Sequence, residues 1–150
     1  MAYSVRVETV AEQLIAAARQ RTTFRMVSKE IGPLLSLPWA FLRAQAGFRP
    51  DGHNVAIYWD AAGGGSIEVG VQVSSRFEAT EAVVCSATPA GTVAATTHFG
   101  PYDRLGAAHQ AVREWCRQNG REIAQPYWET YGHWNDDPTK LRTDVVYRLK

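Results

Sequence analysis

The chain repeats one pattern twice: an apolar helix that ends at a glycine, followed by a strand that carries a tyrosine. The pattern occupies helix 29–46, Gly47 and strand 54–60 in the first copy, and helix 102–119, Gly120 and strand 127–133 in the second. Gly47 and Gly120 are 73 positions apart, and so are Tyr58 and Tyr131. A solenoid needs about three repeats to bury its core. The duplication therefore predicts two pseudo-symmetric halves of one domain, with a cleft between them.

The remaining strands extend the repeat on both sides of each helix. Alternating apolar and polar residues predict a strand at 4–10, and apolar runs predict further strands within 13–23, at 67–73, at 82–85, at 92–98 and at 143–149. The last strands of the two copies match at an offset of 76. The elements follow the order ββαββ twice, and no linker rich in Pro or Ser divides the chain. We predict an α+β fold with halves at about 1–78 and 79–150, in which two helices back a mostly antiparallel sheet.

Glycine and proline mark where these elements end. Gly100-Pro101 predicts the start of the second helix, because proline loses no hydrogen bond in a first turn. Pro38 lies inside the first helix and should kink or divide it. The run 49–52 is typical of a turn, and the three glycines at 63–65 indicate a hairpin connection.

Composition and charge exclude several classes of protein. The chain is 45% hydrophobic and its net charge is +1, with sixteen basic residues scattered among fifteen acidic ones. A protein that binds nucleic acid by neutralising phosphates concentrates its basic residues on one face, so direct nucleic-acid binding is not expected. No run approaches the roughly 18 apolar residues of a membrane span, and the first residues do not form a secretion signal. We expect a cytoplasmic protein.

Two strings in the second half identify a family. His98-Phe99-Gly100-Pro101-Tyr102-Asp103 precedes a helix that contains Trp115, and Trp128-Glu129-Thr130-Tyr131 is followed by an Asp136-Asp137-Pro138 turn. Together they resemble the GyrI-like small-molecule-binding family, which includes the effector-binding domains of AraC-type and MerR-type multidrug regulators. The resemblance covers nearly the whole chain. It implies a single domain over 1–150, whose halves enclose an apolar pocket with aromatic walls.

The resemblance also implies a functional glutamate at position 129. In relatives, a glutamate on this strand lies at the pocket floor and meets cationic or polar aromatic ligands. Glu129 and Tyr131 should face one side of the strand together, because alternate residues share a face. Without the resemblance, a glutamate exposed on a sheet edge would be the simpler interpretation. We expect burial to raise the pKa of Glu129, since desolvation disfavours a charge.

Aromatic residues elsewhere are candidates for the pocket wall. Tyr58 is the repeat partner of Tyr131, so its side chain should face the same cleft. Trp39 is a second candidate from the first half, although packing of its helix is the role that we favour for it. The remaining candidates are Phe99 and Tyr102, which flank the start of the second helix, and Trp134, which follows the second tyrosine strand.

No pattern in the chain indicates a metal or a cofactor. The four histidines lack the spacing of known ligand pairs, and the two cysteines do not form a CxxC pair. The glycines at 63–65 are not followed by the lysine and helix of a phosphate-binding loop.

Three functions follow from the family resemblance. The first is a stand-alone protein that binds or sequesters apolar, aromatic or cationic small molecules such as drugs or toxins. The second is a cofactor-independent hydrolase of cyclopropane-containing, DNA-alkylating natural products, in which Glu129 is the base and Tyr131 or Tyr58 assists. The third is inhibition of DNA gyrase, which the short acidic pair Asp136-Asp137 does not favour. An exposed edge strand would permit a homodimer.

Overall fold

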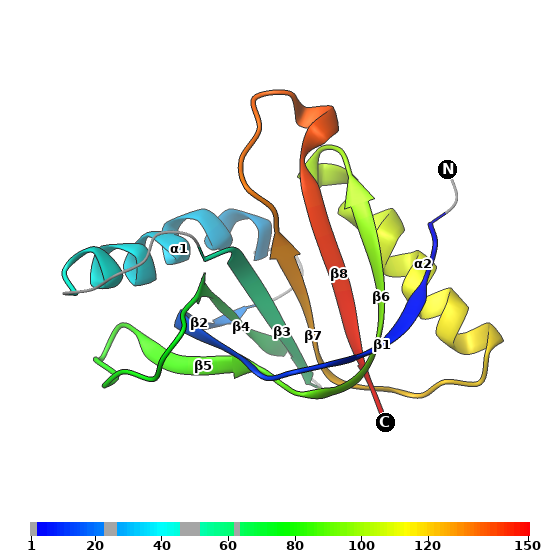
Figure 1. Ribbon diagram of the computed structural model, residues 1–150, viewed down its shortest axis with the longest axis horizontal. Coiled ribbons are helices and arrows are strands. Elements are labelled where there is room, and N and C mark those ends of the chain that lie inside the picture. The colour runs from blue at the N-terminus through cyan, green and yellow to red at the C-terminus, as the bar shows by residue number, and fades with distance from the viewer. Residues whose placement is uncertain (1–2, 23–26, 46–51, 62–63) are drawn as a thin grey trace.

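The described residues form eight strands and two α-helices in the ββαββ order that the sequence predicts, twice over (Figure 1). This computed structural model describes residues 3–22, 27–45, 52–61 and 64–150. The first half consists of β1 (Arg6–Val10), β2 (Gln13–Thr22), α1 (Val27–Arg43), β3 (Asn54–Ala61) and β4 (Gly64–Gln72). The second consists of β5 (Val84–Thr88), β6 (Gly91–Phe99), α2 (Leu105–Gln118), β7 (Ile123–Tyr131) and β8 (Arg142–Leu149). Two short 3₁₀ helices, η1 (Tyr102–Arg104) and η2 (Pro138–Lys140), precede α2 and β8.

All eight strands form one antiparallel sheet, and its strand order reflects the duplication. The order is β1-β6-β8-β7-β3-β4-β2-β5, which reads the same from either end when each strand is exchanged for its repeat partner. β3 and β7 form the central pair, so the two halves join there. At each outer end of the sheet, the edge strand of one half pairs with a strand of the other half. β1 of the first half pairs with β6 of the second, and β5 of the second half pairs with β2 of the first. The α+β fold with a duplicated antiparallel sheet is therefore as predicted.

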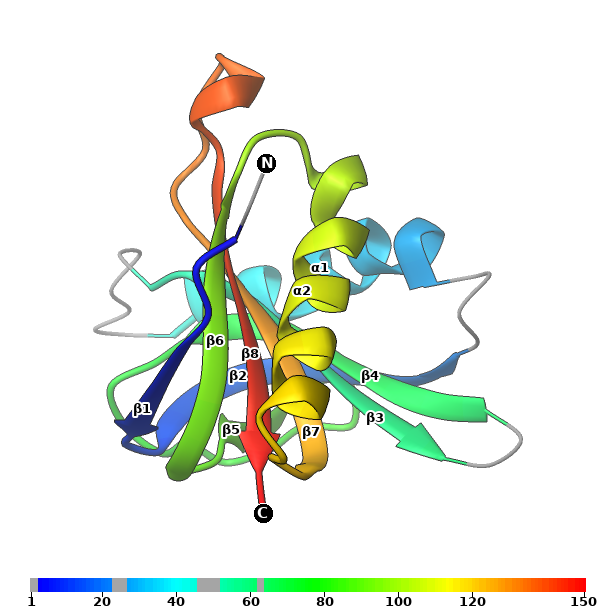
Figure 2. The same ribbon diagram turned by 90° about the vertical axis from the view of Figure 1, so that its right-hand side faces the viewer.

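Both helices pack on one face of this sheet. The buried stripe of α2 places Leu105, Ala108 and Val112 against Tyr127 and Tyr147 of the central strands. Leu34 of α1 packs in a separate cluster against β2, β3 and β4. Figure 2 shows α2 in front of the sheet, with α1 behind it on the same side. Because the helices cover different halves of the face, a space remains between them above β3 and β7.

Among the described residues no helix covers the other face of the sheet, and part of that face is buried by the sheet itself. One apolar cluster joins residues of β2, β3, β6, β7 and β8, and it includes Ile15, Ile57, Val93 and Trp128. β2 and β6 lie near opposite ends of the strand order, so side chains from both can meet only if the sheet curls. Figure 1 shows that curl, with β1, β2 and β5 wrapping below the central strands.

The ends of the elements agree in part with the predicted stops. Gly120 follows α2 with φ of 64°, the left-handed conformation that glycine adopts without steric cost. α1 ends at Arg43, earlier than expected, and Pro33 and Pro38 lie inside it without dividing it. Gly47, Gly63 and residues 49–51 of the predicted turn lie outside the described residues.

Candidate functional site

The central strand pair places Glu129 where the two halves meet. In the β3–β7 register, Ala56 lies opposite Glu129. The offset of 73 that relates Tyr58 to Tyr131 also relates Ala56 to Glu129. These two repeat partners thus face each other, and the pseudo-twofold axis passes between them. Glu129 places a carboxylate on one side of the axis, whereas Ala56 places only a methyl group on the other.

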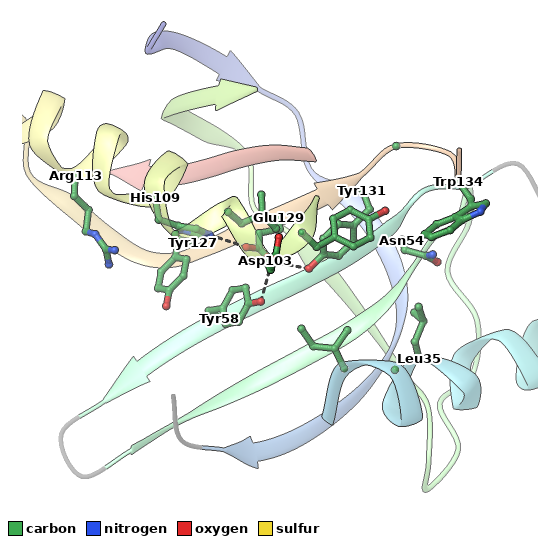
Figure 3. A pocket seen from close by; sticks show the side chains of 16 residues that line it. Leu35, Asn54, Tyr58, Asp103, His109, Arg113, Tyr127, Glu129, Tyr131 and Trp134 are labelled. Carbon is green, nitrogen blue, oxygen red and sulfur yellow. Dashed lines mark hydrogen bonds and ion pairs between the residues drawn. The ribbon is translucent and has the colours of Figure 1, made fainter. Parts of the chain in front are cut away.

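Two tyrosines related by the repeat bind the same oxygen of that carboxylate. The Tyr131 hydroxyl donates to Glu129 Oε1 at 2.5 Å, and the Tyr58 hydroxyl donates to the same atom at 2.8 Å (Figure 3). Tyr131 lies two residues after Glu129 and Tyr58 two residues after Ala56, so strand alternation directs all of these side chains to the face that the helices cover. Glu129 itself is only 5% exposed.

His109 binds the second oxygen from the helix above. Its Nε2 lies 2.6 Å from Glu129 Oε2, and its Nδ1 lies 2.7 Å from the Tyr147 hydroxyl. An ionised carboxylate can only accept hydrogen bonds. Nε2 therefore carries a proton and donates a hydrogen bond to Oε2. Sequence reasoning tested the histidines only as metal ligands and missed this contact. The available signal was the position of His109 four residues after Leu105, beside the buried stripe of α2.

Three tyrosine rings form a stacked column, and two of them carry hydroxyls of this network. Tyr58, Tyr127 and Tyr147 stack across β3, β7 and β8, with ring centroids 5.0 Å and 4.8 Å apart and interplanar angles of 12° and 10°. Burial raises the pKa of Tyr58, Tyr131 and Tyr147 above the ordinary value. Their hydroxyls therefore keep their protons near neutral pH, and those of Tyr58 and Tyr131 stay donors to the carboxylate.

The pKa of Glu129 is lowered. Burial alone would raise it, but the hydrogen bond and charge interaction with His109, and the hydroxyl donors Tyr131 and Tyr58, outweigh burial and hold the pKa below its ordinary value. The expectation of a raised pKa is wrong, because strand periodicity does not reveal donors that come from a helix and from the other half. Glu129 is ionised at neutral pH.

A cavity of about 650 Å³ opens over this network, between α1 and α2. Four of the predicted aromatic residues line it, together with Glu129. They are Tyr58, Tyr102, Tyr131 and Trp134. The Tyr102 ring meets the Tyr131 ring edge-on at a centroid distance of 5.5 Å, and Trp134 is 71% exposed at one end of the cavity (Figure 3).

Two predicted wall residues lie elsewhere. Trp39 packs beside Leu42 and Val71 under α1, and its indole N–H donates to Asn54 Oδ1 at 2.8 Å. Asn54 lines the cavity, so Trp39 is placed behind the wall. Phe99 is 63% exposed at the end of β6 and is outside the lining.

The lining also includes residues that the sequence analysis did not single out. Ile31 and Leu35 of α1 contribute apolar surface, whereas Asp103 of η1 and Arg113 of α2 contribute charges. The position of Arg113 four residues after His109 places both on one face of α2, which is a signal that the sequence contains. Within the described ranges, no three His, Cys, Asp or Glu side chains lie together in a way that could hold a metal ion.

A family comparison assigns the chain to a known family. The family model described as the GyrI-like small molecule binding domain matches residues 3–150. The chain belongs to the GyrI-like family. As a GyrI-like domain it is a small-molecule-binding domain by family, as the sequence motifs predict. None of the curated protein sequences matched the chain.

Solved structures share the GyrI-like fold at low sequence identity. The EcmrR C-terminal domain superposes with a TM-score of 0.82 at 21% identity, covering 100% of this chain and 99% of that one. A chain of the EcmrR–DNA complex gives the same TM-score at 19% identity, and the match spans only 58% of its length. SAV2435 bound to tetraphenylphosphonium has a TM-score of 0.70 at 12% identity, covering 100% and 94% of the two chains. A hydrolase from Listeria innocua has a TM-score of 0.65 at 10% identity, covering 98% and 92%. Neither α1 nor α2, the helices of the described residues, is long and apolar enough to cross a membrane.

Proposed function

We propose that this GyrI-like domain binds aromatic or lipophilic organic cations, such as drugs or toxins, in the cavity between α1 and α2. The observation that carries the proposal is the ionised Glu129, which is buried at the base of an aromatic-walled cavity. The bound tetraphenylphosphonium of SAV2435, a lipophilic aromatic cation, supports this ligand class.

The chemistry of the lining fits such a ligand. Aromatic faces attract a cation by about 0.5–2 kcal/mol each. A carboxylate 4 Å from the cation adds about 4 kcal/mol at an effective dielectric constant near 20. The three donors to Glu129 keep the carboxylate ionised and fixed in position. Asp103, which lines the same cavity, adds a second negative charge that favours entry of cations.

The test compares two ligands of nearly the same shape and different charge. Methyltriphenylphosphonium is a cation, and triphenylphosphine oxide replaces its methyl group with a neutral oxygen. We expect Glu129→Gln to weaken binding of the cation by about 10- to 100-fold and to change binding of the neutral compound little. Calorimetry or quenching of tryptophan fluorescence measures both affinities. Glu114→Gln removes the same charge from the exposed side of α2 and should alter the affinity for neither ligand. Equal losses for both ligands in Glu129→Gln would contradict the role of charge.

A cofactor-independent hydrolase is the second candidate. The hydrogen-bonded pair of Glu129 and His109 at the cavity wall favours it, as does the hydrolase among the structural neighbours. The lowered pKa of Glu129 argues against it, because a weaker base removes a proton from water less readily. Incubation with an electrophilic cyclopropane compound, followed by mass analysis, separates the two functions. A hydrolase returns the compound with one water added, whereas a binding protein returns it intact.

A further inference from the structure

The described lining of the cavity includes an arginine that cation binding does not use. Arg113 lies on α2 four residues after His109, which corresponds to about 6 Å along the helix axis. Its guanidinium carbon is 5.9 Å from the centre of the Tyr147 ring. Figure 3 shows the guanidinium beside Tyr127, at the end of the cavity opposite Trp134, with Glu129 between the two ends. The lining thus has a cationic end and a central anion.

Arg113 makes no hydrogen bond or ion pair with any described residue of the chain. Its guanidinium lies over the Tyr147 ring and interacts electrostatically with Tyr127 and Tyr147. Arg117, one turn further along α2, pairs with Glu114. Asp60 accepts a long hydrogen bond of 3.5 Å from Tyr127 and forms no ion pair with Arg113. The guanidinium therefore keeps its hydrogen-bond donors available to a ligand.

We propose that the cavity selects amphoteric ligands, in which an aromatic cation carries a carboxylate about one helical turn away. The cationic ring system lies over Glu129 and the tyrosines, and the carboxylate of the ligand pairs with Arg113. A guanidinium binds a carboxylate through two parallel N–H donors, which fixes orientation as well as charge. This inference rests on the proposed function and adds a second, opposite charge to the definition of the ligand.

The simpler role for Arg113 is a solvated side chain that covers the Tyr147 ring. In that role the guanidinium contributes through packing and cation–π attraction to the protein itself, and the ligand does not contact it. The two roles differ in one measurable property. Only an anion-binding Arg113 distinguishes a ligand with a free carboxylate from its ester.

The experiment uses two dyes that share one ring system. Rhodamine 110 carries a free carboxylate and is zwitterionic at neutral pH, whereas rhodamine 123 is its methyl ester and is a cation. Fluorescence anisotropy gives the affinity of the whole chain for each dye. We expect rhodamine 110 to bind about tenfold more tightly than rhodamine 123. Arg113→Gln should remove this preference by weakening rhodamine 110 alone, and Arg113→Lys should keep part of it.

Two further variants separate this inference from the proposed function. Arg121→Gln removes an exposed charge just after α2 and outside the cavity, and it should leave both affinities unchanged. Glu129→Gln should weaken both dyes. Equal affinity of the wild-type protein for the two dyes, no binding of rhodamine 110, or equal effects of Arg113→Gln on both would overturn the amphoteric ligand. If Glu129→Gln leaves the affinities for both dyes and for methyltriphenylphosphonium unchanged, the proposed function itself is wrong.

Discussion

The two halves of the molecule share one fold and differ in the chemistry they bring to the cavity. The first half supplies α1, which lines the cavity with Ile31, Gly32 and Leu35. The second supplies η1 and α2, which line it with Asp103, His109 and Arg113. At the axis, Ala56 of the first half faces Glu129 of the second. The duplicated fold is symmetric, but the charged side chains that line the cavity come from the second half.

This asymmetry has a physical reason at the axis. Residues directly opposite on antiparallel strands have Cβ atoms about 4.5–5.5 Å apart. Two carboxylates at that separation in a buried site could not both stay ionised at neutral pH. A single carboxylate with three donors keeps its charge, and the apolar wall from the first half leaves that charge the main electrostatic feature at the cavity floor.

The largest effect should come from making the axis symmetric. Ala56→Glu places a second carboxylate opposite Glu129. We expect it to lower the free energy of unfolding at pH 7 by about 3 kcal/mol more than Ala56→Gln, which has the same shape without the charge. Urea unfolding measures both variants. The double variant Ala56→Glu/Glu129→Gln should recover part of the difference, and equal stability of Ala56→Glu and Ala56→Gln would contradict the argument.

The second effect concerns acid stability. The pKa of Glu129 in the folded protein is below the unfolded value of 4.5. Its contribution to stability is therefore full above about pH 4.5 and is lost as the pH falls through the folded pKa. Protonation weakens three hydrogen bonds at once, so this effect should exceed the loss of any single donor.

Urea unfolding of the wild-type protein and Glu129→Gln from pH 7 to pH 3 measures this contribution. The stability difference between the two proteins should shrink below about pH 4.5. Other acidic groups contribute equally to the pH dependence of stability in both proteins, so their contributions cancel in the stability difference. A difference that stays constant with pH would show that Glu129 is not the ionised group.

The third effect compares two tyrosines related by the repeat. Tyr131→Phe and Tyr58→Phe each remove one hydroxyl donor to Glu129 Oε1. We expect each to cost about 1.5–3 kcal/mol of stability, as for hydrogen bonds to charged groups, with the larger loss for the shorter bond of Tyr131. Both should raise the pKa of Glu129, which an NMR titration of the side-chain carboxyl carbon reports. An unchanged pKa in both variants would remove the tyrosines from the network.

The smallest effect concerns the end of α2. Gly120→Ala places a side chain at φ of 64°, where no neighbouring atom lies within 4 Å of the new Cβ. The cost is therefore conformational and should be about 1 kcal/mol. Thermal unfolding measures it, with Gly106→Ala as the control inside α2, which also meets no neighbour. Because alanine favours a helix interior, Gly106→Ala should be neutral or stabilising, and equal losses in both variants would contradict this account.

Much of the fold could be predicted because its signals are local. The repeated tyrosine-bearing runs at 54–60 and 127–133 indicated strands, and the stripe of Leu105, Ala108 and Val112 indicated a helix. Pro38 shows the limit of such signals. Its ring disfavours a helix interior, yet α1 runs through it, and Pro38 is buried in the packed helix. Tertiary packing outweighed the local preference there.

The sequence by itself determined the duplicated ββαββ order and the common face of Glu129 and Tyr131, because strand alternation depends on neighbours in the chain. Only the tertiary structure decided which groups surround that carboxylate. His109 approaches from a helix and Tyr58 from the other half, so the sign of the pKa shift could not follow from positions near Glu129. The same holds for Arg113 and Asp103, which face the cavity because α2 and η1 pack over the central strands. Charge interactions depend on distance in space, and the folded chain sets that distance.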